Sequence, residues 1–217
     1  MTDALARRLS LVVVTDPGCG EGREIVDVVR AALRGGAPAI QLRGKEQPAR
    51  EQVALARALL AETRTAGALL FVNDRLDVAL AAGADGVHLG QDDLPVETAR
   101  RIVPAGFLVG ISAETPALAR AAERGGADYV GTGPVHATGS KADAGDAVGR
   151  GRIAEVAAAV RIPVVGIGGI DGTNAADVVA AGAAGVAVIS AVMRAPDPER
   201  ATRDLLRAVA EARSPGR

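Results

Sequence analysis

Aromatic residues are almost absent from this chain of 217 residues, which has no tryptophan, one tyrosine and two phenylalanines. The core must therefore be filled by valine, isoleucine, leucine and alanine, which suit parallel strands covered on both faces. Positive charge is not in excess either, because 25 lysines and arginines face 26 acidic residues. Without a basic surface or rings on which bases could stack, the composition excludes nucleic acid as a partner.

Cysteine and long apolar runs are also scarce. Cys19 is the single cysteine, so no internal disulfide can form, and no metal-ligand spacing surrounds it. The first ten residues have no apolar signal core, and no apolar run is long enough to span a bilayer. We therefore expect a cytoplasmic protein with no membrane partner. Its organisation should be one domain over residues 1–217, with flexible ends at 1–8 and 213–217.

Eight apolar stretches alternate with alanine-rich amphipathic segments along the chain. Such alternation of strands and helices implies parallel pairing with right-handed crossovers. Recurring motifs such as AGAD and GGAD place a glycine, for example Gly83 or Gly126, where a helix would end just before a strand. Eight units of this kind predict an α/β fold, a (β/α)8 TIM barrel. The expected strands span residues 9–14, 38–42, 68–72, 85–89, 107–111, 128–132, 163–167 and 185–189.

Acidic residues follow two successive expected strands. Asp74 comes just after the third strand, and Asp92 and Asp93 come after the fourth. The carboxyl ends of barrel strands meet on one face, where the ligand sites of this architecture are built. Paired carboxylates there suit Mg²⁺, which shares its remaining positions with water and substrate phosphates. The alternative is that Asp74 caps the following helix and that the other two lie in a solvated loop.

Glycines at the last two strands predict a phosphate site. The seventh strand runs into Gly168 and Gly169, and the eighth ends at Ser190. In TIM barrels the loops after these strands commonly bind phosphate through backbone N–H groups, which a Cβ atom would block. A glycine-rich turn on its own is weaker support, since glycine also simply permits a tight turn.

Two further loops carry donors for anions. Gln41, Arg43 and Lys45 stand at alternate positions where the second strand ends, so an extended chain directs all three to one side. A solvated basic loop is the alternative, although Gln41 lies in an otherwise apolar strand and needs a partner there. The segment 131–151, after the sixth strand, is long enough to be a binding segment or lid.

The chain resembles the thiamine-phosphate synthase family, also called thiamine-phosphate pyrophosphorylases, over nearly its whole length. The motifs that carry the resemblance are, in order, LVVVTD, QLRGK, VNDRLDVALAAGADGVHLGQDD, VGIS, DYVGTGPV, VGIGGI and VISA. The resemblance implies a Mg²⁺-dependent transferase. Its substrates would be 4-amino-5-hydroxymethyl-2-methylpyrimidine diphosphate and 4-methyl-5-(2-phosphoethyl)thiazole or its carboxylated form, and its products thiamine phosphate and pyrophosphate.

The resemblance also implies roles for individual residues. Mg²⁺ would be bound by Asp74 and Asp93. The pyrimidine diphosphate would be bound by Gln41, Arg43, Lys45, Asn73 and Lys141, with Ser112 nearby. The thiazole phosphate would be bound by Thr138, Ser140, Gly169, Ile189 and Ser190, beside the backbone of Gly168. The expected catalytic residues are Arg43, Lys45, Ser112 and Lys141.

The chain departs from the family pattern just before Thr138. His136 and Ala137 stand where the family usually has an aromatic residue and a proline, and Ser140 replaces a second threonine. These changes bear on thiazole binding rather than on the reaction. Neither histidine is expected to be catalytic, and His88 is interpreted as a half-buried residue near the end of a strand.

Two alternative functions remain. A thiazole tautomerase of the same fold typically lacks the acidic pair and places its catalytic histidine where this chain has Pro134, so Asp74 and Asp93 argue against it. A non-catalytic phosphate-binding barrel protein is the other alternative, because a fold does not dictate a function. The sequence leaves the oligomeric state open and is compatible with a homo-oligomer.

Overall fold

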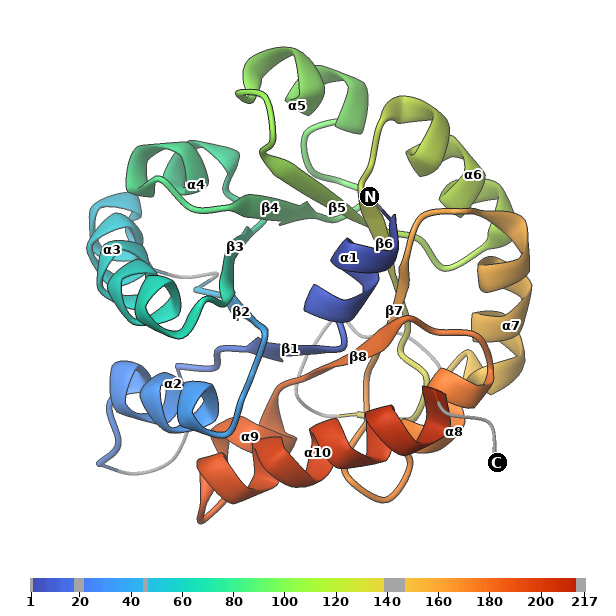
Figure 1. The fold of residues 1–217 in the computed structure, drawn as a ribbon. Coiled ribbons are helices and arrows are strands. Elements are labelled where there is room, and N and C mark those ends of the chain that lie inside the picture. The colour runs from blue at the N-terminus through green and yellow to red at the C-terminus, as the bar shows by residue number, and fades with distance from the viewer. Residues whose placement is uncertain (1, 18–21, 45–46, 139–146, 214–217) are drawn as a thin grey trace.

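Eight parallel strands close into a barrel in chain order, with β8 paired to β1 (Figure 1). The computed structural model describes residues 2–17, 22–44, 47–138 and 147–213. The predicted TIM barrel in a single domain is confirmed, and each strand lies within two residues of its expected bounds at either end. The strands are β1 (Leu11–Val14), β2 (Ala39–Leu42), β3 (Leu69–Asn73), β4 (Gly86–Leu89), β5 (Leu108–Ser112), β6 (Tyr129–Thr132), β7 (Val164–Ile167) and β8 (Gly185–Val188).

Helices form a ring around the barrel, and their apolar faces pack on the outward side chains of the strands in one large core (Figure 1). Gly83 and Gly126 end two of them, as the repeats predicted, and adopt the left-handed conformation with φ of 74° and 97°. Within the described residues, no helix is both long and apolar enough to cross a membrane. The ring contains α2 (Ile25–Arg34), α3 (Ala49–Ala66), α4 (Leu76–Ala82), α5 (Val96–Ile102), α6 (Pro116–Gly125), α7 (Gly149–Ala159), α8 (Ala175–Ala180), the short α9 (Ser190–Met193) and α10 (Pro198–Arg213).

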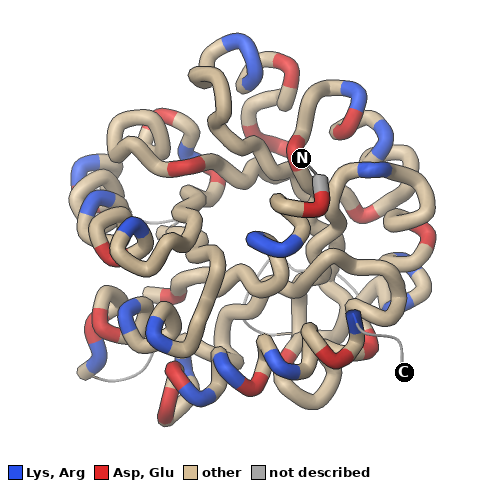
Figure 2. Tube along the Cα trace, in the orientation of Figure 1, with Lys and Arg blue, Asp and Glu red and all other residues tan. Residues whose placement is uncertain are grey.

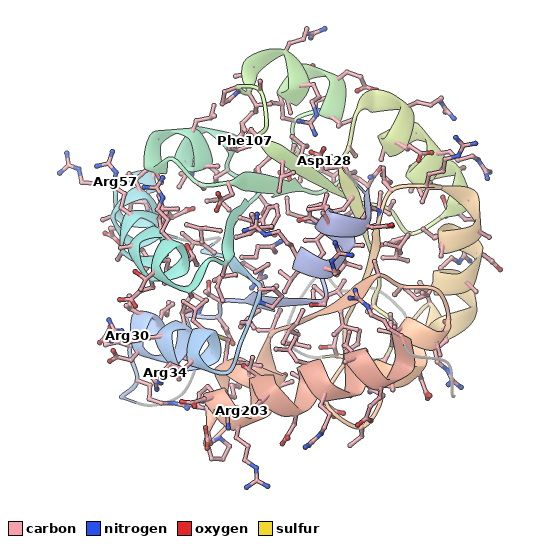
Figure 3. The ribbon with its side chains drawn as sticks, in the orientation of Figure 1. Arg30, Arg34, Arg57, Phe107, Asp128 and Arg203 are labelled. Atoms are coloured by element: carbon pink, nitrogen blue, oxygen red, sulfur yellow. The ribbon has the colours of Figure 1, made fainter. Side chains whose placement is uncertain are left out.

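Ion pairs connect neighbouring helices of this ring, where most charged residues lie (Figure 2). Arg30 of α2 donates to both carboxylate oxygens of Glu62 in α3, at 3.2 and 2.8 Å. Arg34 of α2 donates to Glu199 of α10 at 2.9 Å. Figure 3 shows Arg30 and Arg34 on the outside of the ring. Exposed pairs of this kind each contribute only about 0.2–1 kcal/mol to stability.

The barrel interior holds a second apolar cluster. Phe71 and Tyr129 meet edge to face within it, with ring centroids 5.4 Å apart. The amino-terminal helix α1 (Thr2–Arg8) lies across one end of the barrel in Figure 1, and its Leu5 packs against this cluster. Arg213 at the end of α10 donates to the carbonyl oxygen of Ala6 at 2.9 Å.

These contacts correct the sequence interpretation of the chain ends. Residues 1–8 were expected to be flexible, but Thr2–Arg8 forms a helix that covers the barrel interior. The other expected flexible end began at residue 213, whereas Arg213 belongs to α10 and residues 214–217 lie outside the described part. A seven-residue helix with few apolar residues has too short a hydrophobic pattern to be recognised, and its docking depends on the closed barrel.

Candidate active site

A cavity of about 510 Å³ lies at the carboxyl ends of β5 to β8. This is the end of a barrel where the sequence predicted ligands to bind. The structure brings together there the predicted residues Ser112, Thr138, Gly168, Gly169, Ile189 and Ser190, all of which line the cavity. Residues far apart in the sequence thus meet around one space.

The turn after β7 is bare backbone. Gly168 and Gly169 have φ values of 100° and 62°, which side-chain-bearing residues rarely adopt. A Cβ atom on Gly168 would lie 2.5 Å from Cβ of Pro134, and one on Gly169 would lie 2.7 Å from Cβ of His136. No side chain fits at either position, so the turn presents backbone groups to the cavity, as an anion site requires.

Two side chains next to this turn are charged or titratable. The backbone N–H of His136 donates to the carbonyl oxygen of Gly168 at 3.0 Å. The Nε2 atom of His136 is buried and has no hydrogen-bond partner among the described residues. Asp171 lines the cavity, and hydrogen bonds from the hydroxyl and backbone N–H of Thr173 lower the pKa of its carboxyl, with a smaller contribution from His136. That His136 is not catalytic stays a prediction.

Arg43 directly follows β2, and two hydrogen bonds to Thr15 fix the position of its backbone. Its N–H donates to Oγ1 of the fully buried Thr15 at 2.9 Å, and this hydroxyl lies 3.4 Å from the Arg43 carbonyl oxygen, to which it donates. The Nε atom of Arg43 is buried without a hydrogen-bond partner in the described part of the chain. A buried guanidinium N–H without a partner is costly, so an anion bound here would satisfy it.

The acidic loops after β3 and β4 lie side by side, because Asn73 is the register partner of His88. Among the described residues, Asp74 is the one non-glycine residue with positive φ, at 64°. Its N–H donates to the carbonyl oxygen of His88 at 2.8 Å, and the next N–H, of Arg75, donates to that of Asn73 at 2.7 Å. Such a three-residue turn costs roughly 1–3 kcal/mol and is typically retained where a side chain must be aimed at a functional site.

Asp93 is held in the neighbouring loop. Its Oδ2 accepts a hydrogen bond of 2.7 Å from the N–H of Gly90, and its side chain is partly buried, whereas Asp92 is exposed. The described residues contain no group of three or more His, Cys, Asp or Glu side chains that could bind a metal. At these adjacent strand ends, Asp74 and Asp93 offer one carboxylate each.

Ser112 at the end of β5 connects the cavity to the barrel interior. Its Oγ lies 3.0 Å from Nε2 of His88, whose Nδ1 lies 3.0 Å from the hydroxyl oxygen of Tyr129. The amide of Gln91 donates to the Ser112 carbonyl oxygen. His88 is partly buried in β4, as expected. Sequence analysis did not single out Tyr129, although a lone tyrosine in a strand of an aromatic-poor chain is a signal that could have been used.

Of the other predicted residues, some are described by the structure and some are not. Gln41 and Asn73 are buried at the ends of β2 and β3. Thr15 was missed, although a threonine directly after a buried strand needs a hydrogen-bond partner. The predicted Lys45, Ser140 and Lys141, together with Cys19, lie outside the described residues.

A sequence profile described as thiamine monophosphate synthase matches residues 11–192. The chain belongs to this family. The thiamine-phosphate synthase of Methanoculleus marisnigri is 55% identical over 207 residues, covering 95% of this chain and 98% of its own. That of Moorella thermoacetica is 54% identical over 203 residues, covering 94% and 97%. The thiamine phosphate pyrophosphorylase structure from Pyrococcus furiosus has a TM-score of 0.87 at 43% identity and covers 96% of this chain and 98% of its own.

Membership in the thiamine monophosphate synthase family confirms the resemblance found in the motifs. The profile begins at the first residue of β1 and ends within α9. It therefore spans all eight strands and the whole lining of the cavity, from Ser112 to Ala191.

Proposed function

We propose that this protein is a transferase that joins 4-amino-5-hydroxymethyl-2-methylpyrimidine diphosphate to 4-methyl-5-(2-phosphoethyl)thiazole or its carboxylated form. The products are thiamine phosphate and pyrophosphate, together with carbon dioxide when the carboxylated thiazole is the substrate. The observation that carries the proposal is the cavity at the carboxyl ends of the strands, which Ser112 and the bare turn at Gly168 and Gly169 line together. The identity of 55% to a thiamine-phosphate synthase over almost the whole chain supports the same reaction.

The thiazole phosphate binds at the turn after β7. The backbone of Gly168 and Gly169 and the hydroxyls of Thr138 and Ser190 supply donors to its phosphate, and Ile189 lines the same wall. Ser140, outside the described residues, joins this group in our assignment. Holding the phosphate fixes the ring nitrogen, which is the attacking atom, in one place.

The pyrimidine diphosphate binds toward β2 and β3. Arg43, whose buried Nε has no partner in the described residues, donates to the diphosphate, and Gln41 and Asn73 add donors at the same strand ends. In our assignment Lys45 and Lys141, which fall outside the described residues, bind the same group. Charge-assisted donors suit a diphosphate because its negative charge increases as it leaves.

Asp74 and Asp93 fit a Mg²⁺ ion by the chemistry of their donors. Each supplies a hard carboxylate oxygen, and Mg²⁺ is commonly bound by one or two carboxylates together with substrate phosphates. The strained turn at Asp74 supports an aimed side chain. When bound, Mg²⁺ supplies positive charge that neutralises the diphosphate.

Side chains and backbone groups of the protein then stabilise the charge of the departing diphosphate and hold the thiazole nitrogen in position. The bond between the pyrimidinylmethyl carbon and the diphosphate oxygen breaks, and both electrons leave with pyrophosphate. Arg43 and Ser112 donate hydrogen bonds to the departing anion. The thiazole nitrogen, held by its phosphate at Gly169, attacks the carbon, so no nucleophile of the protein is needed.

The direct test is to incubate the purified protein with both substrates and Mg²⁺ and to measure thiamine phosphate and pyrophosphate. Equal amounts of the two products are expected. Isomerisation of the thiazole carboxylate without condensation would favour the tautomerase instead. Binding of both phosphates without any product would favour a non-catalytic phosphate-binding barrel.

Gly169→Val is predicted to raise the KM for the thiazole phosphate by at least about tenfold, or about 1.4 kcal/mol. The new side chain would meet His136 and Ala137 and displace the turn from the phosphate. Steady-state kinetics with each substrate varied in turn measures the effect.

Gly172→Val is the matched control in the same loop. A Cβ atom at Gly172 has no heavy atom within 4 Å, and its φ is not positive, so the substitution meets no obstacle. The KM values of this variant should stay within about twofold of the wild type. An unchanged KM for the thiazole phosphate in folded Gly169→Val would contradict the assignment.

A further inference from the structure

Three side chains from consecutive strands form a chain of hydrogen bonds that runs from the barrel interior to the cavity. Tyr129 of β6 is buried inside the barrel, and its hydroxyl oxygen lies 3.0 Å from Nδ1 of His88 in β4. The other ring nitrogen of His88, Nε2, lies 3.0 Å from Oγ of Ser112, which lines the cavity. A buried residue thus reaches the substrate site through one imidazole.

Glycines make the space for this chain. Gly110 of β5 is the register partner of both His88 and Tyr129, and a Cβ atom there would lie 2.1 Å from Cζ of the tyrosine ring. A Cβ atom on Gly131 would lie 2.9 Å from Cε1 of His88. The two rings fill the positions where side chains of β5 and β6 would otherwise be, with centroids 5.5 Å apart. Their packing therefore holds both rings in place.

The direction of the hydrogen bonds follows from the surroundings of Tyr129. Burial raises the pKa of the Tyr129 hydroxyl well above its usual value, so the phenol keeps its proton. Nδ1 of His88, at 3.0 Å, is the hydrogen-bond partner of this hydroxyl among the described residues. A buried O–H group needs an acceptor, so the phenol donates its proton to Nδ1 of His88. A neutral imidazole that accepts at Nδ1 carries its own proton on Nε2 and donates it to Ser112.

We propose that Tyr129 and His88 are positioning residues that make the Ser112 hydroxyl a hydrogen-bond donor toward the leaving diphosphate. Because Oγ of Ser112 accepts from His88, its proton is free to point into the cavity. With the other tautomer, Ser112 would donate to Nε2 and present only lone pairs to an anion, which would repel it. The proposal rests on the function proposed above, since it requires an anion beside Ser112.

The proton arrangement can be measured directly in the substrate-free protein. The chain has two histidines, so ¹⁵N-histidine NMR gives two ring systems, and the spectrum of His136→Gln assigns the signals of His88. In an alkaline buffer His88 should carry its proton on Nε2 in the wild type, and Tyr129→Phe should produce a mixture of tautomers. A wild-type ring protonated at Nδ1, alone or together with Nε2, would overturn the proposal.

Kinetics test whether this arrangement acts through Ser112. Tyr129→Phe should lower kcat about tenfold, less than the roughly hundredfold loss expected when a donor to a developing anion is removed, as in Ser112→Ala. The KM values should change by less than about twofold. The double variant should be no slower than Ser112→Ala alone, because its Ser112 hydroxyl is already lost. Losses that multiply would mean that Tyr129 acts independently, and the proposal would be wrong.

A second pair of variants covers the case in which Tyr129→Phe does not fold. His88→Gln can still bring an amide N–H toward Ser112, whereas His88→Leu cannot, so the glutamine variant should retain the higher kcat. Equal losses in the two folded variants would overturn the proposal. If the wild type forms no thiamine phosphate, the proposed function fails, while the NMR result still reports which His88 nitrogen carries the proton.

Discussion

Asp93→Asn is expected to lower the turnover number at ordinary Mg²⁺ concentrations by at least about a thousandfold. The stabilisation of transition-state charge by a bound metal ion is worth several kcal/mol, and each 1.4 kcal/mol or so is a factor of ten in rate. Asparagine keeps an oxygen that can accept from the N–H of Gly90, so the loop should keep its conformation. The change therefore removes the charge of the carboxylate and little else. Turnover is measured by the release of pyrophosphate.

Asp92→Asn is the matched control, because the neighbouring Asp92 is exposed and is not assigned to the metal. This variant should retain nearly full activity, and both variants should unfold within a few degrees of the wild type. Raising the Mg²⁺ concentration should partly restore Asp93→Asn, and EDTA should abolish wild-type activity. Full activity of Asp93→Asn, or a wild type indifferent to EDTA, would remove Asp93 from a metal site.

Arg43→Ala is expected to raise the KM for the pyrimidine diphosphate by about ten- to a hundredfold, since a hydrogen bond to a charged group contributes about 1.5–3 kcal/mol. The substitution removes the buried Nε of Arg43, which has no partner in the described residues and is the donor assigned to the diphosphate. The affinity for the thiazole phosphate should change by less than about twofold, because our proposal assigns that ligand to the turn at Gly169. Calorimetry with each ligand separately measures both effects.

Arg30→Ala provides the control for loss of an arginine elsewhere. Arg30 lies on the outer ring in Figure 3 and pairs with Glu62, so its removal should affect neither ligand. Arg43→Lys should fall between the wild type and Arg43→Ala, because lysine keeps the charge but loses the planar pair of donors. If Arg43→Ala weakened the thiazole phosphate instead, our division of the site into two anion regions would be reversed.

Much of the fold could be predicted because its signals are local. Each strand is a short run of β-branched and other apolar residues, and glycines such as Gly83 and Gly126 mark helix ends where φ must be positive. The ends of the strands then indicate one face of the barrel, which is why residues as far apart as Asp74 and Ser190 could be expected there. The resemblance to the family added Ser112, which lines the cavity with Ser190. Helix α1 was missed because its stability comes from docking Leu5 on the barrel interior.

The sequence by itself determined the barrel, the family and the kind of chemistry at the ends of the strands, because each depends on the order of residues along the chain. Tertiary structure alone decided which side chains meet. Three hydrogen-bonded pairs join residues that are 24 to 41 positions apart in the sequence: Tyr129 with His88, His88 with Ser112, and Thr15 with Arg43. Those contacts depend on strand register and on the space left by Gly110, which exist only once the barrel has closed.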